Sequence, residues 1–258
     1  MLINCEFYSK ALRTNTNVNV IIPEQDCTKN KYYDSDIEYP VLYLFHGVMG
    51  NYSDWVRYTR IENYVQKYNL AVVMPSAQNS FYNDIPNGMK YWTYISEELP
   101  EVMRGLFHFS EKRENNFVAG LSMGGYGALK LALRKPEKFC AVASLSGAID
   151  VVEMIKQGGE IAGTDFLKEA FCDLTKVEGS ENDLKYIIKK LKNSGNDIPK
   201  IFQCCGTEDT LYPINIEFRD YVKSLGIDIK YEEGKGAHTW DFWDEYIQKV
   251  LEWLPIKK

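Results

Sequence analysis

The stretch AGLSMGGYG, residues Ala119–Gly127, surrounds one serine with four glycines and one alanine. The apolar run NNFVAG, residues 115–120, leads into this serine, and a helical pattern, GGYGALKLALRKP, begins two residues after it and stops at Pro136. Gly120, Ser122 and Gly124 form the spacing G-x-S-x-G. A serine on a sharp turn between a strand and a helix needs small residues two positions away on each side, because larger side chains would collide there. The stretch therefore predicts a nucleophilic serine, with a glycine-rich packing turn as the structural alternative.

Short apolar runs alternate with helical patterns along most of the chain. Two alternating runs predict antiparallel strands at 3–9 and 17–23, and six apolar runs predict strands at 39–47, 69–77, 115–122, 139–147, 199–209 and 227–236. The intervening patterns predict helices at 54–68, 96–109, 124–136, 214–226 and 239–254. Strands that are apolar on both faces are typical of a mostly parallel sheet covered by helices on both sides. The predicted fold class is α/β, in one domain of residues 1–258, with a polar helical insertion at 150–196 that is a candidate cap.

The base that would activate the serine is sought among three histidines, His46, His108 and His238. A serine hydroxyl is a poor nucleophile without an adjacent base. On folds with a G-x-S-x-G turn the acid and then the histidine follow the serine along the chain. Only His238, in GKGAHTWDFW, lies after Ser122, so it is the predicted base.

The acid is expected on a loop that follows a strand between these two residues. The segment CCGTEDTLYP follows the apolar run KIFQCC, and its Asp209 is the predicted acid. Its role would be to hold the imidazole tautomer and to stabilise the imidazolium. Glu208, one residue earlier, and Asp150, at the end of the preceding strand, remain alternatives.

Two backbone N–H groups are expected to bind the oxyanion of the tetrahedral intermediate. The N–H of Met123 is one, because it follows the nucleophile. The second is expected in the loop after YLFHG, from Val48, with Gly47 allowing a close approach of the backbone. His46 is then interpreted as a residue that shapes this loop, and His108 as a surface residue at a helix end.

Aromatic side chains are concentrated in the loops expected around the serine. Flat apolar rings can contact an acyl chain, an aromatic acid or a sugar. Packing in the core is the alternative for any one of these rings. The expected substrate contacts are Tyr52, Trp55, Tyr82, Trp92 and Trp240, with Phe81 and Tyr91 on the same loops.

Composition excludes several classes of protein. A net charge of -6 and the absence of a basic cluster argue against nucleic-acid binding. No apolar stretch reaches the roughly 18 residues of a membrane span, and the first twenty residues lack the pattern of a signal peptide. The six cysteines match no zinc-binding spacing and are interpreted as free thiols of a cytoplasmic protein. A homo-oligomer is compatible with these features.

Six segments together resemble the esterase branch of the α/β-hydrolases: YLFHGVMGNYSDW, ISEELPEVM, FVAGLSMGGYGALKLAL, LSGA, CGTEDTLY and GAHTWDFW. This branch includes tributyrin esterases, S-formylglutathione hydrolases, and feruloyl and acetyl xylan esterases. In length and in the segment AVVMPSAQNSFYND the chain is most similar to tributyrin esterases. The resemblance is weakest across 150–196. It implies an α/β-hydrolase fold and a triad of Ser122, Asp209 and His238, with no metal and no organic cofactor.

The residues and the resemblance together predict a serine carboxylesterase for short-chain acyl or aromatic-acid esters, with sugars among the candidate alcohols. Thioester hydrolysis of the S-formylglutathione type and acyl transfer to an alcohol are alternatives, because they use the same triad. S-formylglutathione hydrolases usually carry a cysteine in the loop after the third strand, and GVMGNYSDW has none. A non-catalytic binding module is a remote alternative, because such proteins generally lose a member of the triad.

Overall fold

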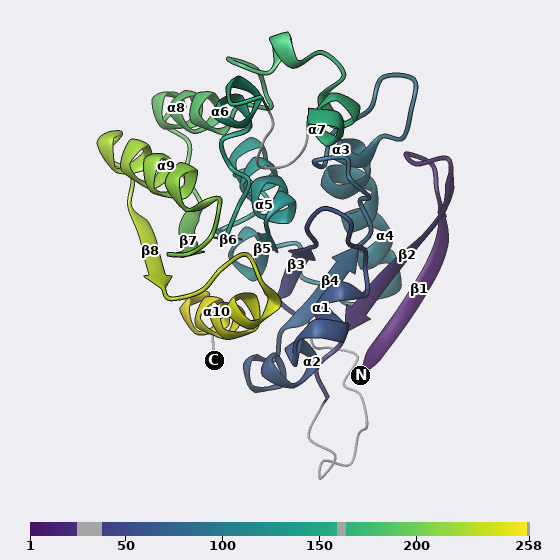
Figure 1. Cartoon of the computed structure of the whole chain (residues 1–258). Helices are drawn as coiled ribbons and strands as arrows, with labels where there is room; N and C mark the ends of the chain where they lie inside the picture. The colour runs from purple at the N-terminus through teal and green to yellow at the C-terminus, as the bar shows by residue number, and fades with distance from the viewer. Residues whose placement is uncertain (25–37, 159–163, 257–258) are drawn as a thin grey trace, which may run out of the picture.

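A mixed β-sheet of eight strands forms the centre of the computed structural model, which describes residues 1–24, 38–158 and 164–256 (Figure 1). The strands are ordered β1-β2-β4-β3-β5-β6-β7-β8 across the sheet. β1 pairs antiparallel with β2 and β2 with β4, while all neighbours from β4 to β8 are parallel. The mostly parallel sheet predicted from the sequence is therefore confirmed. The strands are β1 (Leu2–Ser9), β2 (Thr14–Ile21), β3 (Val41–Phe45), β4 (Ala71–Pro75), β5 (Asn116–Leu121), β6 (Ala141–Leu145), β7 (Lys200–Gly206) and β8 (Ile229–Gly234).

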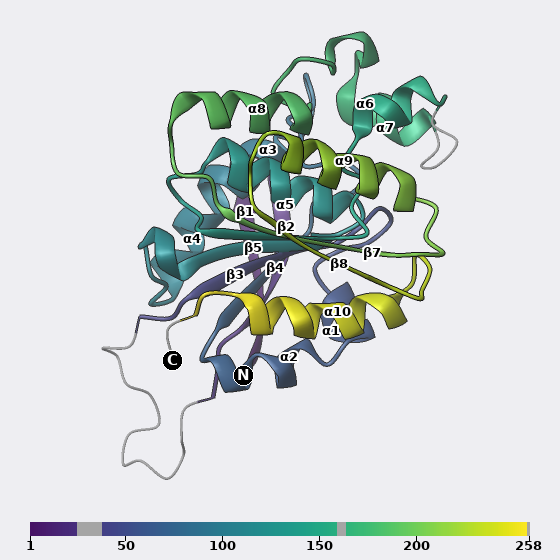
Figure 2. The ribbon, with the colours of Figure 1, turned by 90° about the vertical axis from the view of Figure 1, so that its left-hand side faces the viewer.

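Helices cover both faces of the sheet, as Figure 2 shows. One face packs against α1 (Asp54–Tyr58), α2 (Ile61–Tyr64) and α10 (Trp240–Trp253). The other packs against α4 (Leu99–Leu106), α5 (Met123–Arg134), α8 (Leu184–Ser194) and α9 (Tyr212–Ser224). This three-layer arrangement explains why the central strands are apolar on both faces.

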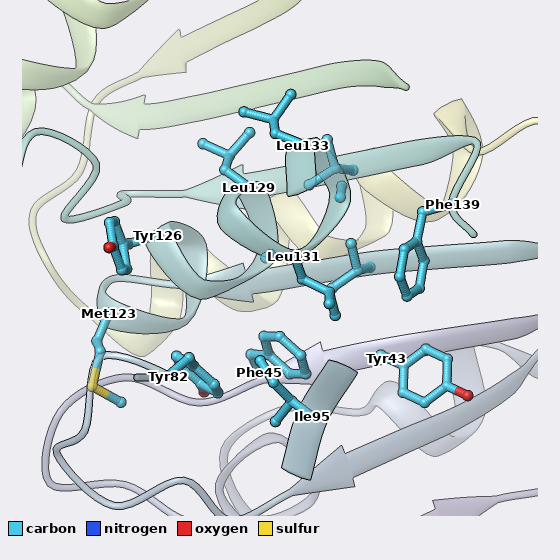
Figure 3. Packing of buried hydrophobic residues seen from close by; sticks show 14 of the residues in the cluster. Tyr43, Phe45, Tyr82, Ile95, Met123, Tyr126, Leu129, Leu131, Leu133 and Phe139 are labelled. Carbon is cyan, nitrogen blue, oxygen red and sulfur yellow. The ribbon is translucent and has the colours of Figure 1, made fainter. Parts of the chain in front are cut away.

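The side chains of β3 illustrate how one strand serves two cores. Tyr43 and Phe45 point into the core beneath α5, whereas Leu42 and Leu44 point into the core beneath α10. Successive side chains of a strand point to opposite faces, so an unbroken apolar run fills both layers. Figure 3 shows the first of these cores, where Phe45 lies beside Tyr82 from a loop that follows β4. The two rings stack at a centroid distance of 4.6 Å.

Two predicted helices differ from the structure. The segment 54–68 is interrupted at Thr59, whose backbone is extended and whose hydroxyl oxygen accepts a hydrogen bond from the N–H of Ile61 at 3.1 Å. It therefore forms α1, α2 and a short 3₁₀ turn, η1 (Gln66–Tyr68). The helix predicted at 96–109 begins earlier, with α3 (Tyr91–Thr93) and the π-helical turn η2 (Tyr94–Glu98), and ends at Leu106. Phe107 is extended, which ends α4.

The segment 150–196 contains three helices in its described part: α6 (Val151–Lys156), α7 (Thr164–Phe171) and α8, with the 3₁₀ turn η4 (Leu174–Lys176) between the last two. Another short 3₁₀ turn, η3 (Arg113–Asn115), precedes β5. α8 packs against α5 and α9 and so belongs to the helical layer. α7 lies over the loop after β4, because the ring of Phe171 contacts that of Phe81 at 5.5 Å. Residues 159–163 of the segment lie outside the described part.

Candidate active site

Ser122 occupies the single residue between β5 and α5. Its backbone angles, φ 54° and ψ -120°, lie in a region that non-glycine residues rarely adopt. Such a conformation persists only where surrounding contacts impose it. Here the N–H of Ser122 donates to the carbonyl of Leu145 at 2.9 Å, and its carbonyl accepts from Gly125 and Ala148, both at 3.0 Å. The strained turn is thus held by backbone hydrogen bonds to Leu145 of β6, to Gly125 of α5 and to Ala148 in the segment that follows β6.

The glycines on both sides of the serine are required by close approach of the backbone. A Cβ atom on Gly120 would lie 2.3 Å from the carbonyl oxygen of Gly124. A Cβ on Gly124 would lie 2.6 Å from the carbonyl oxygens of both Phe45 and His46. No larger residue fits at either position without moving the backbone, which is the physical reason for the G-x-S-x-G spacing.

His238 joins the serine to a buried carboxylate. Its Nε2 lies 3.0 Å from the Oγ of Ser122, and its Nδ1 lies 2.9 Å from Oδ2 of Asp209. The other carboxylate oxygen of Asp209 accepts the N–H of Leu211 at 2.8 Å. Burial raises the pKa of Asp209, but the hydrogen bonds from His238 and Leu211 outweigh it and hold the pKa below the usual value. The carboxylate is therefore ionised and can orient the imidazole.

The two other candidate acids lie elsewhere. Oδ1 of Asp150 accepts the N–H of Glu153 at the start of α6, and its Oδ2 pairs with Lys185 at 2.5 Å. Glu208 is exposed and makes no contact with the histidine. His108 is also exposed. Among the candidates from the sequence, the structure thus brings only Asp209 and His238 to Ser122.

The loop between β3 and α1 runs beside the serine. A Cβ on Gly47 would lie 3.3 Å from Cβ of Ser122, so this residue passes close to the nucleophile. His46 is fully buried, with Nδ1 2.6 Å from the carbonyl of Gly47 and Nε2 2.8 Å from the N–H of Ala77. Nε2 must accept from that N–H, so Nδ1 carries the proton and the ring is neutral. Burial lowers the pKa of His46 to about 4.

The expected oxyanion donors both flank the nucleophile. Met123 is the first residue of α5, so its N–H has no partner within the helix. Val48 follows Gly47 in the loop beside the serine. Within the described part of the chain, neither N–H donates to a protein acceptor. The arrangement leaves two donors free beside Ser122.

Two of the five aromatic residues expected at the substrate are core residues instead. Trp55 is buried and donates its ring N–H to the carbonyl of Phe45 at 3.0 Å. Tyr82 is buried and donates its hydroxyl to the carbonyl of His46 at 2.9 Å. Both rings therefore anchor the loop beside the serine through hydrogen bonds to its backbone. The expectation that they contact substrate is corrected, because they are buried in the core.

The other expected aromatic residues lie in different environments. Trp92 stacks against the guanidinium of Arg134, 3.9 Å from the ring centroid, and lines neither of the cavities described below. Tyr52 is half-buried and is held through its backbone by Asn19 and Ser76. Phe81 is buried, and Tyr91, although almost fully buried, lines the second cavity described below. Of the five residues expected to bind substrate, only Trp240 lines the cavity at the serine.

A cavity of about 480 Å³ opens at Ser122, and we call it the serine cavity. Its volume lies within the usual range for small-molecule sites. Several of its walls were not expected from the sequence. Trp243 was missed, although it lies three residues after Trp240 on the same helix and its ring contacts that of His238 at 4.8 Å. The lining residues are Gly47, Val48, Met49, Gly50, Asp54, Tyr58, Leu121, Ser122, His238, Thr239, Trp240 and Trp243.

A second cavity of about 350 Å³ shares Met49 and Gly50 with the serine cavity, and we call it the polar cavity. Its other lining residues come from the loop after β4, from α3 and from α7. None of the residues that line either cavity, as far as the chain is described, is a lysine or an arginine. The remaining walls of the polar cavity are Gln78, Asn79, Ser80, Ile85, Tyr91 and Glu169.

Residues 1–24, 38–158 and 164–256 contain neither a metal-binding cluster nor a membrane-spanning helix. No group of three or more His, Cys, Asp or Glu side chains is placed to hold a metal ion there. No helix in these ranges is both long and apolar enough to cross a membrane. Five of the six cysteines lie in these ranges and are free thiols, while Cys27 lies outside the described residues.

Comparison with known proteins agrees with this geometry. The model of the family described as "Putative esterase" matches residues 9–254. An acetyl esterase of Caldicellulosiruptor saccharolyticus is 37% identical over 98% of this chain and 97% of its own. Two solved structures from Staphylococcus aureus are similar over nearly the whole of both chains. Fluorophosphonate-binding serine hydrolase F is 31% identical, with a TM-score of 0.90 over 100% of this chain and 99% of that one. An S-formylglutathione hydrolase is 32% identical, with a TM-score of 0.87 over 98% of each chain.

A strained serine between strand and helix, a histidine within hydrogen-bond distance and a substrate-sized cavity are the parts that serine-dependent ester hydrolysis requires. The matched family and relatives cover almost the whole chain. This chain therefore belongs to the esterase family and is a serine carboxylic-ester hydrolase with an α/β-hydrolase fold.

Proposed function

We propose that Ser122 is the nucleophile of this esterase, His238 its general base and Asp209 the residue that orients the histidine. The observation that carries the proposal is the continuous chain of hydrogen bonds from Asp209 through His238 to Oγ of Ser122, at 2.9 and 3.0 Å. These distances lie within the range for a nucleophile and its base.

The reaction follows from these contacts. Oγ of Ser122 attacks the ester carbonyl as its proton passes to Nε2 of His238. The tetrahedral intermediate then collapses, the C–O bond to the alcohol breaks, and the histidine returns the proton to the leaving oxygen. A water molecule, activated by the same histidine, attacks the acyl-enzyme and releases the acid. Asp209 stabilises the imidazolium in both halves of the reaction without taking the proton.

The N–H groups of Met123 and Val48 complete the proposed machinery as the oxyanion hole. Both are free of protein acceptors in the described part of the chain. Their value lies in preorganisation, because donors that are already in place need no rearrangement when charge develops. His46 holds the Val48 side of the pair through its bonds to Gly47 and Ala77.

The acyl group is proposed to be short, from acetyl to butyryl, and to lie in the serine cavity. Leu121, Trp240 and Trp243 provide apolar surface there, and about 480 Å³ must hold the scissile group as well. Each further buried methylene adds about 0.8 kcal/mol of binding only where the pocket continues. The named activity of the acetyl esterase relative supports a short acyl group.

The alcohol is proposed to be neutral and bulky, with an acylated sugar as the leading candidate. Asp54 and Glu169 lie in the walls of the two cavities, and among the described residues no lysine or arginine lines either one. A substrate anion would bring a second negative charge close to these carboxylates. Thioester hydrolysis is a second candidate because of the S-formylglutathione hydrolase relative, although the two carboxylates disfavour the anionic glutathione.

Two further parts of the proposal concern the whole protein. A cytoplasmic location is supported by the free thiols of Cys5, Cys140, Cys172, Cys204 and Cys205. Assembly into a homo-oligomer is supported by the edge strand β1, where Leu2 is 40% and Tyr8 62% exposed. Light scattering on the purified protein tests the oligomer.

The main test measures kcat/KM on 4-nitrophenyl esters from acetate to palmitate, with Ser122→Ala as the reference. The substitution should lower kcat by ~10³-fold or more and leave the fold unchanged. Activity of the wild type should fall beyond about four to six carbons, because the pocket ends there. A Ser122→Ala enzyme within tenfold of the wild type would refute the nucleophile, and a maximum at eight carbons or longer would refute the short acyl group. Faster turnover of S-formylglutathione would favour the second candidate.

A further inference from the structure

We propose that the polar cavity is the alcohol subsite of the esterase, that it takes a neutral polyhydroxylated alcohol, and that Glu169 is its main specificity-determining residue. The inference rests on the proposed function, since it assigns the two halves of the ester to two cavities. The acyl half lies in the serine cavity among apolar rings, and the alcohol half extends past Met49.

The two cavities are joined through one loop. Residues Gly47–Gly50 line the serine cavity, and Met49 and Gly50 also line the polar cavity. Met49 is 79% exposed, so its side chain stands between the cavities without closing either one. Its N–H donates to Oδ1 of Asn79 at 2.6 Å, which ties the dividing residue to the floor of the polar cavity. An ester with its carbonyl at Ser122 can therefore place its two halves on opposite sides of Met49.

The side chains of the polar cavity suit hydroxyl groups. Gln78 offers an amide with donors and an acceptor, and Ser80 offers a hydroxyl. The carboxylate of Glu169 is an acceptor only, and it forms no ion pair or side-chain hydrogen bond within the described residues. Sugar hydroxyls donate as well as accept, so they match a wall of amides with one unpaired carboxylate. Met49 and Ile85 supply apolar surface for the C–H face of a ring.

The loop that forms the floor has a strained backbone that is held by contacts with other elements. Gln78, Phe81 and Tyr82 have φ values of 46°, 47° and 55°, which are unusual for large side chains. Tyr82 is held by its hydroxyl bond to His46 and by contact with α5, where a Cβ on Gly127 would lie 2.3 Å from the tyrosine ring. Strain maintained in this way is typical of binding sites that are formed in advance.

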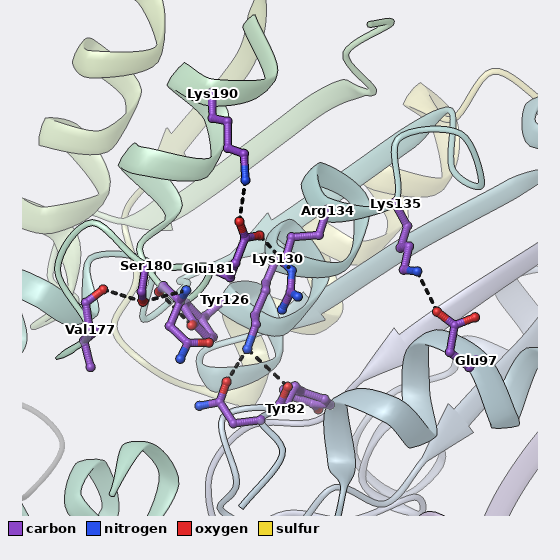
Figure 4. A network of polar contacts seen from close by, with 12 residues as sticks. Tyr82, Glu97, Tyr126, Lys130, Arg134, Lys135, Val177, Ser180, Glu181 and Lys190 are labelled. Atoms are coloured by element: carbon purple, nitrogen blue, oxygen red, sulfur yellow. Dashed lines mark hydrogen bonds and ion pairs between the residues drawn. The ribbon is translucent and has the colours of Figure 1, made fainter. Parts of the chain in front are cut away.

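A buried lysine joins this loop to the helix that carries Glu169. Lys130 of α5 is 1% exposed and donates to the carbonyl of Tyr82 at 3.4 Å and to Oδ1 of Asn83, as Figure 4 shows for the first of these bonds. The amide of Asn83 donates in turn to the carbonyl of Ala170 at 3.2 Å. Ala170 is the neighbour of Glu169 in α7, so the backbone that carries the Glu169 side chain is fixed relative to the loop.

The charge of the walls narrows the class of alcohol. An anionic alcohol would meet Glu169, and the described residues that line the polar cavity include no lysine or arginine to balance the charge. A neutral polyol forms charge-assisted hydrogen bonds to the carboxylate, which are stronger than bonds between neutral groups. A cationic alcohol such as choline would also be attracted by a carboxylate, so it serves as a separate arm of the test.

The experiment compares kcat/KM on acetylated xylo-oligosaccharides, acetylcholine and 4-nitrophenyl acetate for the wild type and three variants. Glu169→Ala removes the carboxylate from an exposed helical position, where alanine favours the helix. Gln78→Asn shortens the amide while tolerating the positive φ. Lys168→Ala, the neighbouring exposed residue on α7 outside the cavity, is the matched control. Circular dichroism checks that all variants are folded.

For Glu169→Ala, the ratio of kcat/KM on the acetylated sugar to that on 4-nitrophenyl acetate should fall about tenfold or more, and for Gln78→Asn it should also fall. The ratio should be unchanged in Lys168→Ala. If this ratio of kcat/KM values were unchanged in Glu169→Ala, the proposed alcohol subsite would be overturned. It would also be overturned if only the kcat/KM for acetylcholine fell, because the carboxylate would then bind a cation and not a neutral polyol. Failure of the proposed function is distinguishable, since the wild type would then hydrolyse 4-nitrophenyl acetate no faster than Ser122→Ala.

Discussion

At the scale of single residues, the geometry around Ser122 separates side chains that react from side chains that hold the site. His238 lies between a hydroxyl and a carboxylate, and part of it remains exposed to the cavity. His46 is the opposite case, since both of its nitrogens are used by the backbone and none is left for substrate. The two histidines have the same chemistry, and their hydrogen-bond partners decide their different roles.

The assignment of the acid is tested by a pair of adjacent substitutions. Asp209→Asn should lower kcat by ~10³-fold or more, because an amide can hold the histidine in the wrong tautomer. Glu208→Gln, one residue earlier and exposed, should stay within about threefold of the wild type. Steady-state kinetics on 4-nitrophenyl acetate measure both. If the Glu208 variant were the impaired one, the acid would lie one residue earlier than proposed.

The neutral state of His46 predicts a dependence of stability on pH. Its pKa is about 4 in the folded protein and about 6.5 in the unfolded chain. Between these values the unfolded chain binds a proton that the folded protein does not, so stability is lost as pH falls from 6.5 to 4. The loss is at most about 3 kcal/mol.

Urea unfolding of the wild type and of His46→Gln across this range isolates the effect, because other titrating groups are common to both. The wild-type free energy of unfolding should fall more steeply with decreasing pH than that of the variant. Parallel profiles would show that the pKa of His46 is the same in the folded and the unfolded state, and would contradict its neutral, hydrogen-bonded form.

At the scale of elements, α5 has two functions that its sequence combines. Its first residue supplies a proposed oxyanion donor, and its glycines let neighbouring segments approach. Gly127 leaves room for the ring of Tyr82, and Gly125 leaves room for Ser144, whose Oγ would lie 2.5 Å from an added Cβ. The helix thereby holds the loop after β4 and strand β6 against the serine turn.

Two glycine-to-alanine substitutions in helices should have opposite effects. Alanine favours a helix over glycine by roughly 1 kcal/mol. Gly105→Ala in α4 should gain about that amount, since no atom lies within 4 Å of the added Cβ. Gly127→Ala should instead lose about 1–3 kcal/mol, because the methyl would clash with a buried ring that has no space to move. Thermal unfolding measures both changes, and stabilisation by Gly127→Ala would mean that Tyr82 does not occupy its described position.

The elements were easier to predict from the sequence than the walls of the site. The parallel strands are read from apolar runs, and the order of Ser122, Asp209 and His238 is read from motif spacing, because both signals are local. The aromatic walls of the cavity cannot be predicted from local sequence, because they depend on how distant segments pack. Trp55 and Trp240 look equally suited to a cleft in sequence, yet the first donates to the carbonyl of Phe45 in the core and the second lines the serine cavity. Only the packing of α1 against α10 decides between them.

The polar cavity was missed for the same reason. Gln78 and Glu169 are 91 positions apart by their numbers, and nothing in either local sequence marks a site. They line the same cavity because the loop after β4 and α7 lie side by side, joined by the hydrogen bond between Asn83 and Ala170. A residue pair of this kind becomes visible only when the tertiary structure is known.

At the scale of the whole molecule, a net charge of -6 surrounds two cavities whose walls contain carboxylates. Charge near a site changes the rate at which charged substrates arrive, and salt weakens this effect. The Debye length falls from about 30 Å at 0.01 M salt to about 8 Å at 0.15 M. The net charge of the molecule would therefore reinforce the proposed preference of the cavities for neutral esters.

A matched pair of substrates tests whether the negative charge of the protein lowers the rate for anionic esters. The anion 4-acetoxybenzoate should be hydrolysed with a lower kcat/KM than its neutral methyl ester at 0.01 M salt, and the difference should narrow as salt is raised. The same measurement on Glu169→Gln should give a smaller difference. A difference that does not depend on salt would show that shape, rather than charge, discriminates between the two.

The position of the triad along the chain has a consequence for biosynthesis. His238 lies 116 residues after Ser122, and its loop is held by β7, β8 and α10, which are made last. At a translation rate of roughly 5–20 residues per second, the serine turn emerges about 6 to 23 s before His238, the base proposed to activate it. During that interval the nascent chain holds an unactivated hydroxyl, so it cannot become trapped as an acyl-enzyme while β7, β8 and α10 have still to fold. Ester hydrolysis by a translating ribosome complex would thus report that synthesis of the domain is complete.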